Sequence, residues 1–359
     1  MTTQQSTGTN WTQLLLAIER HEDLTEEQAA WAMREMMSGS ADPVVVAGFL
    51  IGLRTKGETA AELRGLSETM LTMARPYAGS REAVDIVGTG GDRHNTVNIS
   101  TMAALTIAGA GERVVKHGNR ASTSATGSAD ALERLGVPLD APQERIEAAA
   151  DAVGFSFLFA NTYHPAMRHI APVRRALGVP TVFNVLGPLA NPARVRSSVI
   201  GVADPRMAPL MAEVFARRGD RALVFTGARN LDELSLIGPN EIWETADGQI
   251  QRVRLEPADV DLPGNTLEDI TGRDAAHNAE VIRRVLAGER GPIRDTVVLN
   301  AAAGLVARQG DVRRPLAERI GEAIPRAQQA LDSGAAQRLL EDWIRFLTDG
   351  ESPKTSTSV

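Results

Sequence analysis

The stretch from Asp85 to Glu133 constrains the fold of this chain more than any other part of it. The short apolar run at 84–87 predicts a buried strand, and three glycines follow within the segment 88–91. The segment from about 100 to 110 then predicts a helix. The region therefore begins with a strand, a glycine loop and a helix.

A second unit repeats this arrangement directly. Residues 114–115 predict a strand, and the polar run Lys116–Arg120 lies at its carboxyl end. Hydroxyl-bearing residues between 123 and 128 precede a helix predicted at about 129–135. Because ligands of open α/β sheets bind outside the carboxyl ends of the strands, both loops should face one polar crevice.

The composition of the two loops favours an anion as the ligand. Glycine allows positive φ and lets a ligand approach the main chain, and a helix N-terminus presents unpaired N–H groups at the positive end of its dipole. A single glycine loop after a strand is as easily explained by a tight turn. Two such loops in succession favour a ligand with more than one phosphate.

The overall composition limits the classes of function. The 359 residues carry a net charge of -7, which argues against non-specific nucleic-acid binding because a phosphate backbone requires a basic surface. The absence of cysteine excludes disulfides, thiolate catalysis and cysteine-ligated metals. The sequence has no signal-peptide pattern and no long apolar run, so we expect a cytoplasmic protein without membrane contact.

The segment 11–75 predicts four helices. Capping boxes are predicted at Thr25 and Thr59, Gly39 fits a helix C-terminus, and Pro43 fits a helix start. A methionine-rich apolar stripe at helical spacing follows Thr25 and is predicted to be core. This part of the chain therefore reads as a small helical domain.

From Val84 onward, predicted strands and helices alternate. This alternation indicates an α/β fold with a mostly parallel sheet flanked by helices, beside a smaller all-helical domain formed mainly by the N-terminus. The expected boundaries are a disordered tail at 1–10, the helical domain at 11–78 joined by helices from about 165–190, the α/β domain at 79–348, and a second disordered tail at 349–359.

Further elements are predicted along the α/β part. The predicted strands are 155–159, 198–202 and 223–225. The predicted helices are 144–153, 167–177, one opened by Pro205 behind Asp204 as its cap, and 278–286, 295–306 and 335–346, the last with Trp343 as core. A turn-rich linker with two prolines at 183–192 is predicted to act as a hinge.

Two further segments carry residues suited to a small-molecule site. A guanidinium grips a planar carboxylate with two parallel hydrogen bonds, although an arginine pair such as Arg174–Arg175 is more often a solvated helix face. The adjacent carboxylates Asp232–Glu233 follow a predicted strand between apolar neighbours, where they could hold Mg²⁺ beside a diphosphate. His164 and His169 lack zinc-type spacing, so no metal role is expected for them.

The segments GTGGD, NTVNIST, KHGNRASTS and GSAD together resemble the anthranilate phosphoribosyltransferase family, and the likeness runs from Trp11 to about Leu347. The resemblance implies magnesium-dependent transfer of the phosphoribosyl group from 5-phosphoribosyl 1-diphosphate (PRPP) to the amine of anthranilate. The products would be N-(5-phosphoribosyl)anthranilate and pyrophosphate, in tryptophan biosynthesis. The resemblance also implies a homodimer formed through the helical domain.

The resemblance implies a role for each matching residue. For the PRPP donor it implies Gly88, Gly91, Asp92, Thr96, Asn98, Ile99, Ser100, Thr101, Lys116, His117, Gly118, Asn119, Arg120, Ala121, Ser122, Thr123, Ser124 and Ser128. For anthranilate it implies Gly88, Asn119 and Arg174 as the carboxylate clamp. For two magnesium ions it implies Ser100, Asp232 and Glu233.

The reaction requires positioning and charge stabilisation more than a general base. Departure of pyrophosphate builds negative charge that Lys116, loop N–H groups and magnesium would stabilise. The neutral aromatic amine must be held in line with C1, a task we assign to Asn119 and Arg174. His117 is either an acceptor contact or a structural histidine, so no acid or base is assigned.

The chain departs from the family pattern at three places. Arg93 and His94 follow GTGGD where glycine is usual, so positive φ should be less accessible there. Arg229–Asn230 stands where Asp-Gly is common and adds a cation near the proposed metal site. Ala125 stands where many members carry lysine.

Two other functions remain open on the sequence. A pyrimidine nucleoside phosphorylase would bind inorganic phosphate and a nucleoside, and it would need no Asp-Glu magnesium pair. A non-catalytic nucleic-acid-binding relative would need a basic groove. The Asp232–Glu233 pair and the net charge of -7 argue against these two functions respectively.

Overall fold

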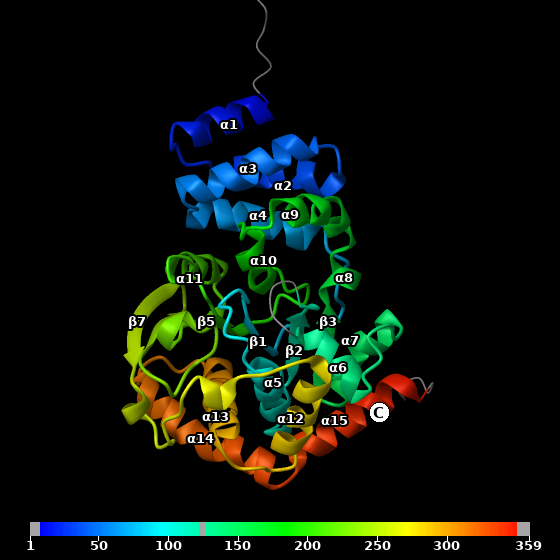
Figure 1. The fold of residues 1–359 in the computed structure, drawn as a ribbon, viewed down its shortest axis with the longest axis vertical. Coiled ribbons are helices and arrows are strands. Elements are labelled where there is room, and N and C mark those ends of the chain that lie inside the picture. Colours follow the sequence, from blue (N-terminus) through cyan, green and yellow to red (C-terminus); the bar gives the residue numbers. More distant parts are fainter. Residues whose placement is uncertain (1–7, 122–125, 350–359) are drawn as a thin grey trace, which may run out of the picture.

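One seven-stranded sheet forms the centre of the computed structural model, which describes residues 8–121 and 126–349 (Figure 1). The strand order is β3-β2-β1-β4-β5-β6-β7. The strands from β3 to β5 in this order pair in parallel, and β6 and β7 add an antiparallel edge. The strands are β1 (Val84–Gly88), β2 (Val114–Gly118), β3 (Phe155–Phe159), β4 (Ser197–Gly201), β5 (Arg221–Thr226), β6 (Asn240–Ala246) and β7 (Gln249–Leu255).

The sheet separates two hydrophobic cores. In β4, Val199 belongs to one core and Ile200 to the other, and in β5 Leu223 and Val224 divide in the same way. Successive side chains of a strand point to opposite faces, so strands covered on both faces are buried along their whole length. The first core also contains residues of α5 (Ile99–Gly109), α6 (Ser128–Leu135), α7 (Gln143–Ala152), α12 (Ala275–Leu286), α13 (Pro292–Gln309), α14 (Leu316–Asp332) and α15 (Ala335–Thr348).

The second core joins the other face of the sheet to the N-terminal helices. Figure 1 shows these helices at one end of the molecule, with α9 beside α4 and α10 between them and the sheet. The helices of this part are α1 (Trp11–Glu19), α2 (Glu26–Ser38), α3 (Pro43–Lys56), α4 (Ala60–Thr72), α8 (Ala160–Tyr163), α9 (Ala171–Leu177), α10 (Phe183–Leu189) and α11 (Met207–Arg218). The architecture confirms the predicted α/β sheet with a smaller helical domain.

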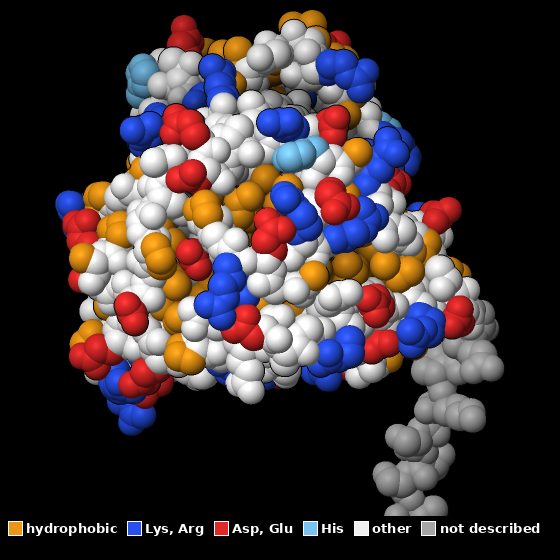
Figure 2. All heavy atoms as spheres, turned by 60° about the horizontal axis from the view of Figure 1, so that its bottom comes forward, with side chains coloured by type: hydrophobic (Ala, Val, Ile, Leu, Met, Phe, Trp, Pro, Cys, Tyr) orange, Lys and Arg blue, Asp and Glu red, His pale blue; other side chains and the backbone are white. Residues whose placement is uncertain are grey.

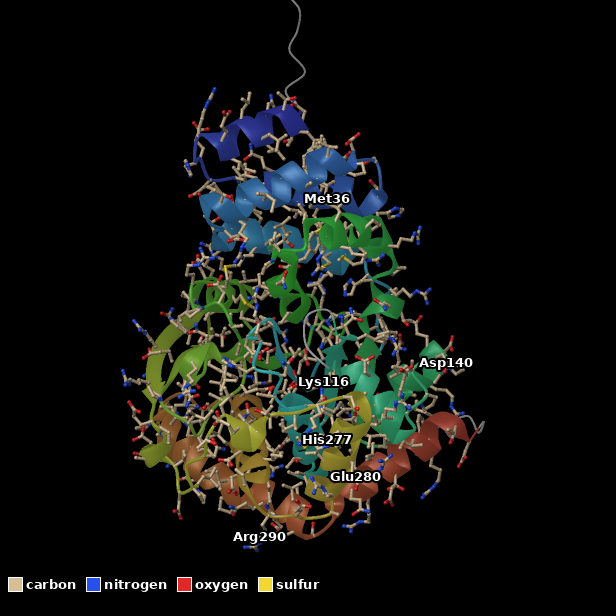
Figure 3. The ribbon with its side chains drawn as sticks, viewed as in Figure 1. Met36, Lys116, Asp140, His277, Glu280 and Arg290 are labelled. Carbon is tan, nitrogen blue, oxygen red and sulfur yellow. The ribbon has the colours of Figure 1, made fainter. Side chains whose placement is uncertain are left out.

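The helix signals of the N-terminal part are confirmed residue by residue. Thr25 Oγ1 accepts a hydrogen bond from the Gln28 N–H at 3.2 Å, which completes one predicted capping box. Gly39 ends α2 with φ 77°, and Pro43 is the first residue of α3. The methionine stripe, including Met36 labelled in Figure 3, is buried as predicted.

Two predictions around the hinge are wrong. The helix expected at 167–177 is divided at Ile170 into a 3₁₀ helix, Pro165–His169, and α9. The linker expected at 183–192 begins with α10, because the Asn184 side chain accepts from the Thr181 N–H at 3.0 Å and starts a helical turn. The proline in the last turn of α10 lies next to its end.

The helix expected directly behind Asp204 begins later, at Met207. Asp204 does not cap it with its side chain, because its carboxylate accepts from the backbone N–H and the guanidinium of Arg206. Instead its carbonyl accepts from the Met207 N–H at 2.9 Å. The predicted core role of Trp343 is confirmed, since its ring packs 4.6 Å from that of Phe155.

The hairpin β6–β7 and helix α14 were not predicted from the sequence. In β7, Arg252 and Arg254 stand at alternate positions and most side chains are exposed, because this strand forms the edge of the sheet, whereas β6 inside it is largely buried. The turn between them, Asp247 with φ 50° and Gly248 with φ 75°, is a strong hairpin signal that predicts two strands in retrospect.

The surface combines charges of both signs. On the face drawn in Figure 2, basic side chains lie among acidic ones, and this view shows no continuous basic stripe in the part of the chain that is described. Among the residues with described positions, no helix is long and apolar enough to span a membrane. Most of the two predicted tails, 1–10 and 349–359, lies outside the described residues.

The capping residue Glu62 of α4 also holds together three separate segments of the helical domain. Its fully buried carboxylate accepts from the N–H groups of Leu24 at 2.9 Å and Thr59 at 2.8 Å. It also pairs with the buried ammonium of Lys56 at 3.1 Å, while Asp23 contacts the same ammonium from the surface. Removing Glu62 would leave the buried Lys56 ammonium with the exposed Asp23 carboxylate and the Gly57 carbonyl as its partners.

We therefore expect Glu62→Ala to lower the free energy of unfolding by about 3 kcal/mol, the lower end for a broken buried pair because Asp23 remains. The matched control is Thr25→Ala, which removes only a surface cap and should cost about 1 kcal/mol. Urea unfolding followed by circular dichroism measures both losses. Equal losses in the two variants would contradict the structural role of Glu62.

Candidate active site

A pocket of about 380 Å³ lies at the carboxyl ends of β1 and β2, between the sheet and helices α4, α9 and α10. Figure 3 labels Lys116 at the centre of the molecule, where β2 ends. The predicted residues that line the pocket are Gly88, Gly91, Asp92, Thr96, Asn98, Ser100, Lys116, His117, Gly118, Asn119, Arg120, Ala121, Ser128, Arg174, Asp232 and Glu233. Segments far apart in the sequence are thus brought together.

Two predicted donor residues do not line the pocket. The side chains of Ile99 and Thr101 are fully buried in the first turn of α5, where they pack into the core. Their predicted role in donor binding would therefore rest on the main chain at the start of α5, and it stays a prediction. The predicted residues Ser122, Thr123 and Ser124, together with Ala125, lie outside the described residues.

The glycine loop after β1 has the predicted left-handed turns. Gly90 has φ 69° and Gly91 has φ 88°. The expectation that Arg93 would avoid positive φ is wrong, because it adopts φ 64°. A left-handed non-glycine residue costs roughly 1 kcal/mol or more, so the surrounding contacts must hold it there. One such contact is His94 Nε2, which donates to the Arg229 carbonyl at 3.0 Å and links the glycine loop to the segment before the carboxylates.

Asn98 connects the start of α5 to the opposite wall of the pocket. It is the N-cap residue of α5, but its side chain makes no capping hydrogen bond. Instead, its Oδ1 accepts from Asn278 at 3.1 Å and its Nδ2 donates to the Thr126 carbonyl at 3.4 Å. The N-terminus of α5 therefore faces the pocket, and the Asn98 side chain does not cap it.

Three glycines allow the Asp232–Glu233 segment to cross directly over the strand ends. A Cβ atom at Gly88 would overlap the Asp232 carboxylate, and one at Gly201 would overlap the Asp232 carbonyl. A Cβ atom at Gly227 would overlap the Glu233 carbonyl. Only glycine at these positions permits this close approach of two backbone segments.

Hydrogen bonds then fix the carboxylate segment from both sides. The Gly90 N–H donates to Asp232 Oδ2 at 2.6 Å. On the other side, the buried Asn300 side chain of α13 accepts from the Leu234 N–H at 3.0 Å and donates to the Leu234 carbonyl at 2.9 Å. The two carboxylates are thus placed by the loop after β1 and by α13 before any ligand arrives.

The carboxylates form an excess of buried negative charge. Burial, followed by repulsion from Asp92, raises the pKa of Asp232 to about 7. Burial, followed by repulsion from Asp232, raises the pKa of Glu233 well above its usual value. The ammonium of Lys116, 1% exposed, donates to the Ile86 carbonyl and to Ser100 Oγ at 3.2 Å. Burial lowers the pKa of Lys116, against the attraction of the nearby carboxylates.

The carboxylate oxygens gathered here are ligands suited to a hard cation. Asp92 Oδ2 is buried and has no hydrogen-bond partner among the described residues, beside two carboxylates that repel it. No group of three acidic or histidine side chains in the described part of the chain is close enough to form a complete metal cage. Mg²⁺ is typically held by one or two carboxylates, with waters and substrate phosphates completing its coordination.

The wall opposite the carboxylates carries Arg174. Its guanidinium lies 5.4 Å from the centre of the Phe183 ring and makes no hydrogen bond to the described residues. Burial lowers the pKa of Arg174 from its ordinary value. The next residue, Arg175, is exposed, so the predicted solvated helix face describes Arg175, while the carboxylate contact of Arg174 stays a prediction.

Two neutral histidines lie between these walls. His117 Nδ1 donates to the Gly187 carbonyl at 3.1 Å, and His164 Nε2 donates to the Ala190 carbonyl at 2.9 Å. The remaining ring nitrogens, His117 Nε2 and His164 Nδ1, are buried acceptors without a partner among the described residues. Burial lowers the pKa of His117 to about 3 and that of His164 to about 4.

Arg120 lines the pocket, but its charge is used within the second loop. Its guanidinium pairs with Glu133 at 2.6 Å and with Asp130 at 3.1 Å. Asp130 also accepts from the N–H groups of Ala121 and Gly127, both at 2.9 Å, and so ties the two ends of the loop together. This use of Asp130 in GSAD was not predicted.

The pocket also contains residues that sequence reasoning did not assign to it. Met70 of α4, Asn161, Met167, Phe183, Asn184 and Pro188 are among its lining residues. Most of them lie on α8 to α10 and the 3₁₀ helix, which were predicted to join the helical domain. Phe183, Asn184 and Pro188 belong to the turn-rich segment 183–192, which was predicted to have a structural role, so its motif was seen without being assigned to the pocket.

Comparison with known proteins supports one family. The glycosyl transferase family a/b domain matches residues 80–337, and the glycosyl transferase family helical bundle domain matches residues 12–74. Anthranilate phosphoribosyltransferase from Arthrobacter sp. (strain FB24) is 52% identical over 340 residues, covering 95% of this chain and 97% of the relative. The enzyme of the same name from Salinispora arenicola (strain CNS-205) is 52% identical, covering 93% and 96%.

Solved structures agree with these relatives. The crystal structure of anthranilate phosphoribosyltransferase from Thermus thermophilus has a TM-score of 0.86 and 44% identity, covering 93% of this chain and 99% of that one. The Saccharomyces cerevisiae enzyme in complex with PRPP and Mg has a TM-score of 0.84 and 28% identity, covering 94% and 98%. A structure of the same yeast enzyme contains 4-fluoroanthranilate. The chain therefore belongs to the anthranilate phosphoribosyltransferase family, within the glycosyl transferases that combine an a/b domain with a helical bundle.

Proposed function

We propose that this protein is an anthranilate phosphoribosyltransferase of tryptophan biosynthesis. It transfers the phosphoribosyl group of PRPP to the amine of anthranilate and releases pyrophosphate. The observation that carries the proposal is the meeting, in one pocket, of the glycine loop, the buried Asp232–Glu233 pair with Lys116, and an unpaired Arg174 on the opposite wall. This arrangement suits a diphosphate on one side and a small carboxylate on the other.

The donor diphosphate would lie on the two loops. The Gly90 N–H is already donated to Asp232, so the main-chain N–H groups of Gly91 and Asp92 in the same loop would offer hydrogen bonds to phosphate oxygens. Lys116 supplies a buried positive charge for the leaving group, held by Ser100 from α5. These groups are in place before the reaction, so they stabilise developing negative charge without reorganising. The side chains of Asn119 and Ser128 complete the donor side of this proposal.

The bound cation would be magnesium, and we propose two ions with Ser100, Asp232 and Glu233 as ligands. The yeast relative was solved in complex with PRPP and Mg, which supports the choice of metal. When bound, the metal neutralises diphosphate charge and assists departure of pyrophosphate. The pKa of both carboxylates is raised in its absence, so a cation and a proton compete for them.

The acceptor would lie against Arg174. The planar guanidinium can bind the anthranilate carboxylate through two hydrogen bonds, while Asn119 and the Gly88 backbone help to orient the amine toward C1 of the ribose. His117 Nε2 is a neutral acceptor that faces the same pocket and is available to the amine N–H. We propose that it contributes to positioning, since the aromatic amine is already neutral and needs no strong base.

The assembly and boundaries are also proposals. We propose a helical domain of 11–78 joined by helices from about 165–190, and an α/β domain of 79–348. Contacts of α9 with α3 and of α10 with α4 support the joining. We further propose a cytoplasmic homodimer formed through the helical domain, because Val44 on α3 is 80% exposed and Leu16 on α1 is 42% exposed. Light scattering of the purified protein tests the dimer.

The two alternative functions are not favoured. A pyrimidine nucleoside phosphorylase would leave the buried carboxylate pair beside Lys116 without a purpose, and the relatives at about 50% identity carry the anthranilate enzyme's name. A nucleic-acid-binding role lacks a specific observation in its favour, because the main pocket is lined by acidic as well as basic side chains.

Replacing the carboxylates should weaken the use of magnesium. We expect Asp232→Asn and Glu233→Gln each to lower kcat/KM by about 10²- to 10³-fold at limiting Mg²⁺, the range for loss of one preorganised charged group. Excess Mg²⁺ should restore part of this loss. The matched control is Glu268→Gln on the surface, which should change nothing. Loss of anthranilate fluorescence follows the reaction, and rates independent of Mg²⁺ in all three variants would contradict the proposal.

Arg174 should determine the affinity for anthranilate. Loss of a charge-assisted, two-hydrogen-bond contact costs about 1.5–3 kcal/mol, so Arg174→Ala should raise the KM for anthranilate by about 10- to 150-fold. The KM for PRPP should change little. The control is Arg175→Ala, one residue further along α9 and exposed. Equal effects of the two substitutions on the anthranilate KM would exclude Arg174 as the carboxylate clamp.

The two histidines should remain neutral throughout the working pH range. The pKa of His164 falls from 6.5 to about 4 on folding, so the unfolded chain binds more protons than the folded one between these values. The free energy of unfolding should therefore decrease as pH falls from 6.5 to 4, by up to about 1.4 kcal/mol for each pH unit and each histidine. His164→Asn should reduce this slope, as measured by urea unfolding at several pH values. An unchanged slope would show that His164 is protonated in the folded protein.

A further inference from the structure

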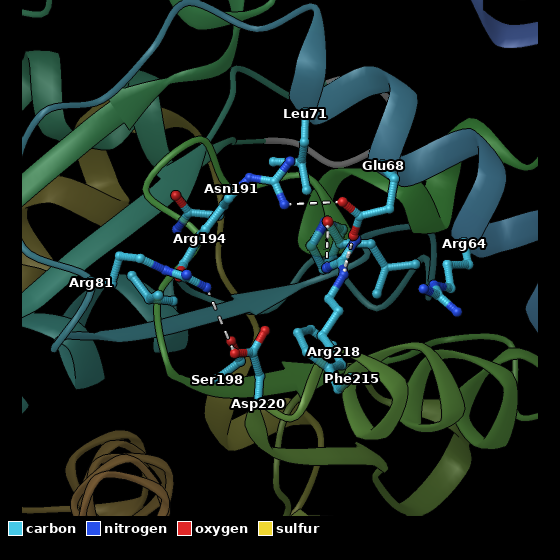
Figure 4. Close-up of a pocket in the computed structure, with 13 residues that line it drawn as sticks. Arg64, Glu68, Leu71, Arg81, Asn191, Arg194, Ser198, Phe215, Arg218 and Asp220 are labelled. Carbon is cyan, nitrogen blue, oxygen red and sulfur yellow. Dashed lines mark hydrogen bonds and ion pairs between the residues drawn. The ribbon is translucent and has the colours of Figure 1, made fainter. Parts of the chain in front are cut away.

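A second cavity lies on the other side of the hinge from the candidate active site. It has a volume of about 200 Å³, and Pro188 of α10 lines both cavities. Its walls come from α4, from the segment 188–195 and from the sheet side of the molecule (Figure 4). The cavity is therefore bounded by the helical domain, by the hinge and by the α/β domain.

Arginines dominate this second cavity. Four arginines and two carboxylates line it, which leaves two formal positive charges in excess. The lining arginines are Arg64 of α4, Arg81 before β1, Arg194 after α10 and Arg218 of α11. The lining carboxylates are Glu68 and Asp220. Such a group of like charges is unfavourable unless the arginines find anionic partners.

Glu68 and Arg218 form an ion pair with a structural role. Glu68 of α4 accepts from Arg218 Nε at 2.6 Å and from Arg194 Nη1 at 2.9 Å (Figure 4). The other nitrogens of Arg218 donate to the Leu189 carbonyl and to Ser67 Oγ, both at 2.9 Å. Every nitrogen of the Arg218 guanidinium thus has a protein partner, and both Glu68 oxygens accept from an arginine.

Arg81 and Arg194 do have capacity left. Arg81 Nε donates to the Arg194 carbonyl at 2.7 Å, which fixes the two residues beside each other. The nearest acid to the end of Arg81 is Asp220, at 3.9 Å, which is beyond hydrogen-bond distance. Arg194 uses only Nη1, so both guanidinium groups keep N–H donors without a partner among the described residues.

The backbone conformation of Arg194 indicates that the residue is held in a fixed position. Arg194 has φ 46°, a left-handed conformation that costs a non-glycine residue roughly 1 kcal/mol or more. Its N–H donates to the Asn191 carbonyl at 2.9 Å, and its own carbonyl accepts from Arg81. The surrounding contacts therefore hold this arginine in a strained position at the edge of the cavity.

We infer that this hinge cavity is a binding site for a small oxyanion of the phosphate class, held between Arg81 and Arg194. Guanidinium groups bind phosphate oxygens through paired hydrogen bonds, and the excess of two positive charges suits a dianion. The Ser198 side chain lines the same cavity and adds a hydroxyl. The carboxylate of Asp220 also faces it and opposes an anion, which limits the affinity.

Isothermal titration calorimetry with inorganic phosphate, in a low-salt chloride buffer, tests this site. Phosphate can also enter the candidate active site, so the hinge event is assigned by the variant that removes it. We expect the double variant Arg81→Gln/Arg194→Gln to lose one binding event or weaken it at least about tenfold. The control Arg313→Gln, which is exposed and pairs only with Asp311, should bind as the original protein does.

A second variant keeps the test decisive if the double variant does not fold. Asp220→Asn removes the opposing carboxylate with little change of shape, so phosphate should bind at least about threefold more tightly. Titrations with pyrophosphate and with glycerol phosphate distinguish a diphosphate or a phosphate ester from free phosphate as the preferred ligand. The inference is wrong if the original protein binds no phosphate, if the double variant keeps every binding event, or if Asp220→Asn binds no more tightly.

Discussion

The close approach of the Asp232–Glu233 segment to the ends of β1 and β4 determines the rest of the site. It is possible only because Gly88 and Gly201 have no side chains. The approach places two carboxylates in a buried position beside Lys116, where the pKa of Asp232 rises to about 7. Such a group is costly to bury without a partner, so the fold stores an unfavourable negative charge that a bound cation can relieve.

The hinge connects this charged site to the helical domain. His117 donates to Gly187 at 3.1 Å and His164 donates to Ala190 at 2.9 Å, so both histidines of the pocket hold the backbone of the hinge. Asn191 then donates to the buried Asp85 of β1 at 2.8 Å. The segment 183–192 is thus linked by hydrogen bonds both to the histidines of the pocket and to β1.

The sequence predicted those parts of the molecule whose signals are local. Strand, glycine loop and helix follow one another within a few residues, and the capping boxes of α2 and α4 are complete within four residues. The motifs also identified most of the pocket lining. The burial of Ile99 and Thr101 depends on packing against distant segments, so no local pattern indicated it. The roles of Gly201 and Gly227 could not be predicted for the same reason, because each glycine makes room for the Asp232–Glu233 segment.

The central claim is that the buried carboxylates and the glycine loop together bind a metal and the donor diphosphate. The most direct test is a crystal structure of the protein with PRPP and Mn²⁺ in place of Mg²⁺, using anomalous scattering to find the metal. We predict metal within about 2.2 Å of oxygens of Asp232 or Glu233, with the diphosphate on the loop that follows β1. A diphosphate bound away from this loop, or metal without either carboxylate as a ligand, would contradict the account.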